Sequence, residues 1–137
     1  MCGLAGFYNL TQENFSANPN HLEAMQKAIA HRGPNGYRCW VSPNEQLGVA
    51  HRRLSILDLS DAGTQPMFDQ ENTVMVMCNG EIYNHPALRQ ELESLGYRYQ
   101  SNSDTETILY AYKQWGIDCL KKFDGMFAIV IYDMLSE

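Results

Sequence analysis

Positive charge is scarce in this sequence. Lys and Arg number 10 against 16 Asp and Glu, so the formal net charge is −6, and the basic residues form no run. Nucleic acids and anionic membranes are bound mainly through clustered Lys and Arg side chains. We therefore expect neither nucleic acid nor membrane among the main partners.

Long apolar runs are also missing. The longest covers residues 126–132, whereas a membrane-spanning helix needs roughly 20 apolar residues. Residues 1–10 contain no Lys or Arg and become polar at Asn9, unlike a secretory signal, which starts basic and continues with an apolar core. The sequence thus predicts a cytoplasmic protein, and its 45% of apolar residues predicts a folded domain.

Motifs for binding metals or phosphates do not occur. The four cysteines form no C-x-x-C pair, and the four histidines show no metal-ligand spacing. Neither G-x-x-x-x-G-K-[ST] nor G-x-G-x-x-G is present, so no nucleotide phosphate cradle is expected. We expect no metal site, and we interpret Cys39, Cys78 and Cys119 as buried thiols.

Hydrophobic periodicity predicts an α+β fold with helices layered on antiparallel sheet. Strands are expected at residues 2–10, 47–51, 53–59, 74–78 and 127–132, and helices at residues 21–30, 86–95 and 104–115. Asn20 is expected to cap the first helix, and Ser103 with Glu106 to form a capping box on the third. The dipeptide Asn79-Gly80 predicts a tight turn after the fourth strand.

The apolar strand at residues 127–132 lies close to the end of the sequence. Its composition is typical of a strand buried on both faces. We therefore expect a domain that is incomplete at its C-terminus, with one edge of this strand unpaired. An unpaired apolar edge invites pairing with another chain, so either self-association through this strand or marginal folding is expected.

Cys2 is the first candidate for chemistry. Its small side chain is of the class that lets the initiator Met be removed, which would make Cys2 the first residue. The α-amine, with a pKa of about 7.7–8.0, would then serve as general base for the thiol of the same residue. The alternative is a cysteine that lies near the start by chance.

Other residues could complete a site for an amino acid amide. Asn79 and Gly80 could place two N–H donors on an oxyanion, or they could form a plain hairpin turn. Arg53 suits a carboxylate, and Glu81 and Asp104 suit an ammonium. Each of these charges could equally be solvated or structural.

Seven blocks of the sequence occur in an order that resembles one family. They are MCGLAGF (1–7), HRGPN (31–35), HRRLSILDL (51–59), QPM (65–67), NGEIYNHPALRQEL (79–92), SDTETIL (103–109) and GMFAIVIYD (125–133). Together they resemble class II glutamine amidotransferase domains, most of all the N-terminal glutaminase domain of glutamine-hydrolysing asparagine synthetases. The resemblance covers essentially the whole chain.

The resemblance implies an N-terminal nucleophile fold, a four-layer α/β/β/α sandwich of antiparallel sheets. Residues 1–137 would be the glutaminase domain, incomplete at the C-terminus and without its synthetase domain. Cys2 would be the nucleophile, and Asn79 and Gly80 the oxyanion hole. The glutamine pocket would be formed by Arg53 for the α-carboxylate, Asp104 for the α-ammonium, Glu81, and the backbone around Leu54, Ile56 and Leu57.

The resemblance also implies the partners. Glutamine would be the substrate, and the domain itself would need no cofactor. ATP and magnesium would belong to a C-terminal synthetase domain of the full-length protein, which would use the ammonia. Two alternatives stay open: a non-catalytic fragment that binds glutamine or packs on a partner, and an N-terminal nucleophile hydrolase of another amide.

Overall fold

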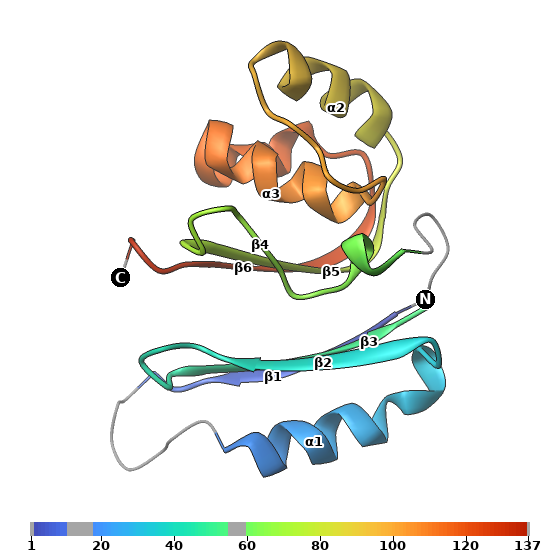
Figure 1. Ribbon diagram of the computed structural model, residues 1–137, viewed down its shortest axis with the longest axis vertical. Coiled ribbons are helices and arrows are strands. Elements are labelled where there is room, and N and C mark those ends of the chain that lie inside the picture. The colour runs from blue at the N-terminus through green and yellow to red at the C-terminus, as the bar shows by residue number, and fades with distance from the viewer. Residues whose placement is uncertain (1, 11–17, 55–59, 137) are drawn as a thin grey trace. The chain divides into compact units, whose positions relative to one another are not determined.

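The computed structural model describes residues 2–10, 18–54 and 60–136. They fall into two compact units, Met1–Ser55 and Ile56–Glu137. Each unit contains a three-stranded antiparallel sheet with helices on one face (Figure 1). The predicted α+β class with antiparallel sheets is therefore confirmed, and each unit supplies one sheet layer and one helix layer.

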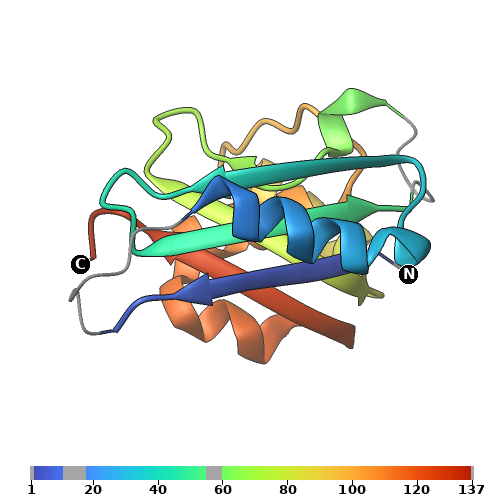
Figure 2. The same ribbon diagram turned by 90° about the horizontal axis from the view of Figure 1, so that it is seen from below.

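The first unit holds strands β1 (Gly3–Tyr8), β2 (Gly36–Val41) and β3 (Leu47–Arg53) in the order β1-β3-β2. Helix α1 (Pro19–Ala28) lies along this sheet and contacts all three strands (Figure 2), and the short 3-10 helix η1 (Ala30–Arg32) follows it. The buried residues of α1, Leu22 and Gln26, lie four positions apart. They therefore share one face of the helix.

The second unit holds strands β4 (Met67–Phe68), β5 (Val74–Ile82) and β6 (Gly125–Asp133) in the order β4-β5-β6. Helices α2 (His85–Ser94) and α3 (Asp104–Trp115) pack on one face (Figure 1), with 3-10 helices η2 (Asp61–Gly63) and η3 (Gly116–Lys122). Alternate residues of β5 and the inner faces of both helices form its core; among them are Val74, Val76, Cys78, Leu92 and Ile108.

Several predicted elements are confirmed, and others need correction. Helix α1 begins at Pro19, and its cap is Asn18, whose side chain accepts from the Asn20 amide; the prediction that Asn20 caps it is wrong. Strand β2 was not predicted, because its residues do not alternate between buried apolar and exposed polar positions. Its neighbouring residues Arg38 and Cys39 are both exposed. The prediction that Cys39 is buried is wrong, whereas Cys78 and Cys119 are buried. Residues 55–59 of the predicted strand 53–59 lie outside the described residues.

The predicted turn at Asn79-Gly80 is wrong. Strand β5 continues to Ile82 and pairs with β6, with Asn79 opposite Ala128 and Gly80 opposite Phe127. Hydrogen bonding to a strand far along the chain thus overrides the local turn preference of the dipeptide.

Strand β6 is less buried than its composition predicts. Met126 is 60% exposed and Phe127 37%, while Tyr132 near the other end is buried. β6 lies at the edge of its sheet, and β5 is its strand partner within the described residues. The prediction that this strand is buried on both faces is therefore wrong.

The link between β4 and β5 is organised by the carboxylate of Asp69, whose side chain is fully buried. It accepts hydrogen bonds from the Thr73 and Val74 amides, the Thr73 hydroxyl and the Lys113 ammonium. Burial acts to raise the pKa of Asp69, but the hydrogen bonds from Lys113 and from the Thr73–Val74 segment hold it well below its ordinary value.

We expect Asp69→Asn to lower the free energy of unfolding by about 1–3 kcal/mol at neutral pH, because buried donors lose an ionised acceptor. A carboxylate whose pKa is lowered in the folded state stabilises the fold fully above its ordinary pKa. This stabilisation decreases as the pH falls from the ordinary pKa toward the lowered one. Urea unfolding at pH 7 and pH 3 should therefore show the gap between wild type and variant narrowing in acid. Glu71→Gln is the control, since Glu71 binds the same Lys113 but is 62% exposed. An equal gap at both pH values would contradict the assignment.

Candidate functional site

The first unit places Cys2 next to Arg53 and Leu54. β1 pairs with β3 so that Gly3 lies opposite Arg52, which brings the residue before Gly3 beside the residues after Arg52. The Cys2 Sγ is 3.3 Å from the Leu54 amide nitrogen, which donates to it, and 3.6 Å from the Leu54 carbonyl oxygen. The predicted nucleophile, just before β1, and the predicted carboxylate-binding Arg53, at the end of β3, thus lie beside each other.

The HRGPN block supports this cluster. Arg32 Nε donates to the Cys2 carbonyl oxygen at 3.0 Å. Gly33 lies so close to β3 that a Cβ at this position would overlap the backbone of Arg52 and Arg53. The Asn35 amide donates to the Arg53 carbonyl at 3.1 Å. This block therefore holds the backbone on both sides of the cluster.

No role for Arg32 was predicted from the sequence. No periodicity or spacing relates residue 32 to residue 2. The contact exists because η1 brings the end of the α1 segment back to the start of β1. The hydrogen-bond partner of Arg32 therefore depends on tertiary structure.

The second unit brings Asn79, Gly80 and Glu81 close to Asp104. These residues lie at the end of β5 and at the first position of α3. The Ile82 amide donates to Asp104 Oδ2 at 2.9 Å, which joins the two elements directly. Asp104 is 7% exposed, and the N-terminal end of a helix favours the negative charge of its carboxylate.

Asn79 and Gly80 have features expected of residues in a ligand-binding site. The buried Oδ1 of Asn79 has no hydrogen-bond partner among the described residues. A buried polar atom of this kind is costly unless something binds it. Gly80 has φ +148°, and a Cβ there would overlap the backbone of Met126 and Phe127, so glycine is required at this position.

The predicted site residues therefore fall into two clusters. Cys2, Arg53 and Leu54 belong to the first unit, and Asn79, Gly80, Glu81 and Asp104 to the second. Ile56 and Leu57 lie outside the described residues. Among the residues that the structure describes, no group of three His, Cys, Asp or Glu side chains could hold a metal ion. No helix in the described ranges has the length and apolar character needed to cross a membrane.

The fold is similar to that of a solved amidotransferase. The structure matches a solved glutamine phosphoribosylpyrophosphate amidotransferase from Bacillus subtilis with a TM-score of 0.66 and 20% identity, over 97% of this chain and 35% of that one. The predicted N-terminal nucleophile amidotransferase fold is thereby confirmed. The family model described as "Glutamine amidotransferase domain" matches residues 1–137, and the chain belongs to this family.

Curated relatives agree with this family. Asparagine synthetase [glutamine-hydrolyzing] 1 of Bacillus subtilis is 38% identical over 136 residues, covering 97% of this chain and 21% of the relative. Amidase chry2 of Gibberella zeae is 34% identical over 143 residues, again covering 97% and 21%. The chain thus spans about a fifth of the length of these relatives. The predicted similarity to glutamine-hydrolysing asparagine synthetases is confirmed.

Proposed function

We propose that this domain hydrolyses the side-chain amide of glutamine to glutamate and ammonia, with Cys2 as the nucleophile. The observation that carries the proposal is the position of Cys2. Its thiol lies at the start of β1 against the Leu54 amide and beside Arg53, in a chain whose whole length matches a glutamine amidotransferase domain. A cysteine that lies near the start by chance would have no reason to contact the Leu54 amide beside Arg53.

The proposed reaction starts with removal of Met1, which frees the α-amine of Cys2. This amine takes the thiol proton, and the thiolate attacks the amide carbon of glutamine. The resulting oxyanion accepts hydrogen bonds from Asn79 and Gly80, each worth about 3–4 kcal/mol in comparable sites. The amine then gives its proton to the leaving ammonia, and water hydrolyses the γ-glutamyl thioester to glutamate.

Substrate recognition is assigned to charges at both ends of the amino acid. Arg53 would bind the α-carboxylate with two parallel hydrogen bonds, which a guanidinium forms and an ammonium does not. Asp104 would bind the α-ammonium, because the Ile82 amide fixes one of its oxygens and its carboxylate is nearly buried. Glu81 and the backbone around Leu54, Ile56 and Leu57 would complete the pocket.

The ammonia would serve an ATP-dependent amidation in a separate synthetase domain of a longer protein. The support is that the curated relatives are about five times as long as this chain and include asparagine synthetases. The proposed hydrolysis needs no cofactor, and ATP and magnesium would act in that other domain. A cytoplasmic location stays a prediction, as does self-association through β6.

Ammonia release from a panel of amides tests this proposal. We expect hydrolysis of glutamine, and at least ~10²-fold less of asparagine, whose shorter side chain misplaces the amide carbon relative to the thiol. Intact mass of the same sample establishes whether Met1 has been removed. Equal rates on asparagine would favour a hydrolase of other amides. Glutamine binding without ammonia release, in protein that begins at Cys2, would favour the non-catalytic alternative.

A further inference from the structure

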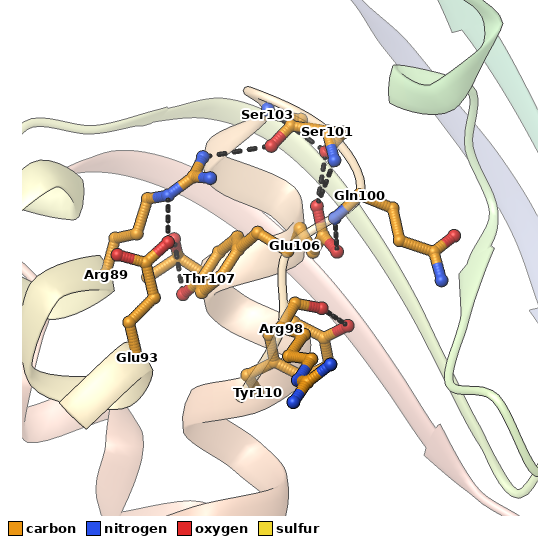
Figure 3. Close-up of polar contacts among 10 residues, drawn as sticks. Arg89, Glu93, Arg98, Gln100, Ser101, Ser103, Glu106, Thr107 and Tyr110 are labelled. Atoms are coloured by element: carbon orange, nitrogen blue, oxygen red, sulfur yellow. Dashed lines mark hydrogen bonds and ion pairs between the residues drawn. The ribbon is translucent and has the colours of Figure 1, made fainter. Parts of the chain in front are cut away.

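The loop before α3 is held by the carboxylate of Glu106. Glu106 Oε1 accepts from the Gln100 amide at 2.8 Å, and Oε2 accepts from the Ser101 amide at 2.7 Å and the Ser101 hydroxyl at 2.6 Å (Figure 3). The predicted capping box, in which Glu106 would accept from Ser103, is therefore wrong. The carboxylate points back past the helix start to the loop.

Glu106 is buried, and neutral hydrogen-bond donors of the preceding loop surround its carboxylate. Its residue is 4% exposed, and its carboxylate accepts hydrogen bonds from three donors of Gln100 and Ser101. Charge-assisted bonds of this length are strong, and an ionised group at this depth would be costly without them. The geometry of residues 100–101 is therefore closely coupled to the Glu106 carboxylate.

The same loop is fixed at two further points. Arg89 Nη1 donates to the Ser101 carbonyl oxygen at 2.9 Å, and the Tyr110 hydroxyl donates to the Arg98 carbonyl oxygen at 2.9 Å (Figure 3). Burial, together with the charge of Glu106, raises the pKa of Tyr110 to about 12. These contacts leave residues 98–101 little freedom.

A relay of hydrogen bonds connects this loop to the first turn of α3. The Ser101 hydroxyl, which donates to Glu106, also accepts from the Ser103 amide at 3.2 Å. The Ser103 hydroxyl in turn accepts from the Thr105 amide at 3.2 Å. Asp104 lies between the last two residues of this relay, and its carboxylate accepts from the Ile82 amide. Any movement of Ser101 would thus be transmitted to the backbone that carries Asp104.

We propose that Glu106 is a positioning residue for recognition of the substrate ammonium: through Ser101 and Ser103 it fixes the backbone that presents the Asp104 carboxylate. This inference rests on the proposed function, in which Asp104 binds the α-ammonium of glutamine. Glu106 itself would touch neither substrate nor the reacting atoms. Its loss should therefore weaken the preference for substrates that carry an α-ammonium and leave the chemistry of the amide largely intact.

The experiment compares glutamine with glutaramate, the same molecule without the α-amino group. We expect Glu106→Gln to lower kcat/KM for glutamine by about 10- to 100-fold, mainly through KM, because charge-assisted hydrogen bonds in the relay are lost. Turnover of glutaramate should change less than about threefold, so the preference for glutamine collapses. Glu91→Gln is the matched control, since Glu91 lies on the same helix α2 but pairs with Lys122, which belongs neither to the loop nor to the relay.

Ser101→Ala separates positioning from a direct effect of the Glu106 charge. It breaks the relay without changing any charge, and it should reduce the preference for glutamine in the same direction. An unchanged preference in Ser101→Ala, or an equal loss for both substrates in Glu106→Gln, would overturn the proposal. If Glu106→Gln does not fold, as judged by circular dichroism and melting, Ser101→Ala alone decides.

Binding measurements keep this inference distinct from the proposed function. Calorimetric titration of both ligands into Cys2→Ala protein, with and without Glu106→Gln, measures ammonium recognition in the absence of turnover. Wild-type protein that binds glutamine but releases no ammonia would refute the proposed function and leave the Glu106 comparison intact. Equal loss of affinity for the two ligands would refute the role of Glu106 whatever the wild-type activity.

Discussion

Cys2→Ala is expected to reduce ammonia release from glutamine by roughly 10⁴- to 10⁶-fold, as removal of the nucleophile does in other acyl-transfer enzymes. Stability should change by less than about 1.5 kcal/mol, because the thiol is half-buried and makes long, weak contacts with Leu54 at 3.3 and 3.6 Å. Alanine is also a small second residue, so removal of Met1 should proceed as before. Ammonia release and melting of the same preparation provide the two measurements.

Cys39→Ala is the matched control for this prediction. It makes the same chemical change in the same unit, but Cys39 is an exposed residue of β2. Ammonia release from this variant should equal that of the wild type. Comparable activity of Cys2→Ala and Cys39→Ala would remove Cys2 from the role of nucleophile.

Gly80→Ala is expected to damage both stability and activity. A methyl group there would overlap the Met126 carbonyl oxygen and lie 2.5 Å from the Phe127 Cα, and φ at this position is +148°. Overpacking and the strained backbone together should lower the free energy of unfolding by about 2–5 kcal/mol. Displacement of an oxyanion donor should in addition lower kcat by about 10²- to 10³-fold. Urea unfolding and ammonia release measure the two effects.

Gly96→Ala distinguishes steric overlap from backbone strain. Gly96 follows α2 with φ +101°, but nothing lies within 4 Å of a Cβ built there. In this variant only backbone strain should act, and it should lower the free energy of unfolding by about 1–2 kcal/mol. Ammonia release should be unchanged. Equal stability of the two variants would show that Gly80 does not need its close approach to β6.

The helices of the second unit were predictable because their signals are local. Ser103 before the periodic apolar run predicted the start of α3, and its hydroxyl does accept from the Thr105 amide. Pro86 in the first turn of α2 and Gly96 just after its end marked that helix equally well. Each of these residues acts on backbone within a few positions, so sequence spacing suffices.

Partners other than those that the local pattern predicts were found elsewhere. Asn79-Gly80 is a strong turn dipeptide, yet it continues a strand because β6 supplies hydrogen bonds along its whole length. Glu106 has the spacing of a capping box with Ser103, yet its buried carboxylate binds the amides of Gln100 and Ser101. For Glu106, three donors of the loop bind the carboxylate, where a capping box would supply one.

The order of its motif blocks determined the family and the candidate residues of this protein, from Cys2 through Arg53 and Asn79 to Asp104. This conclusion needs only the residue types and their order along the chain. Tertiary structure alone decided which atoms meet: Arg32 on the Cys2 carbonyl, Ile82 on Asp104, and Glu106 on the loop before it. The physical reason is that such hydrogen bonds depend on strand register and on the path of the loops. Neither produces a periodic pattern in the sequence.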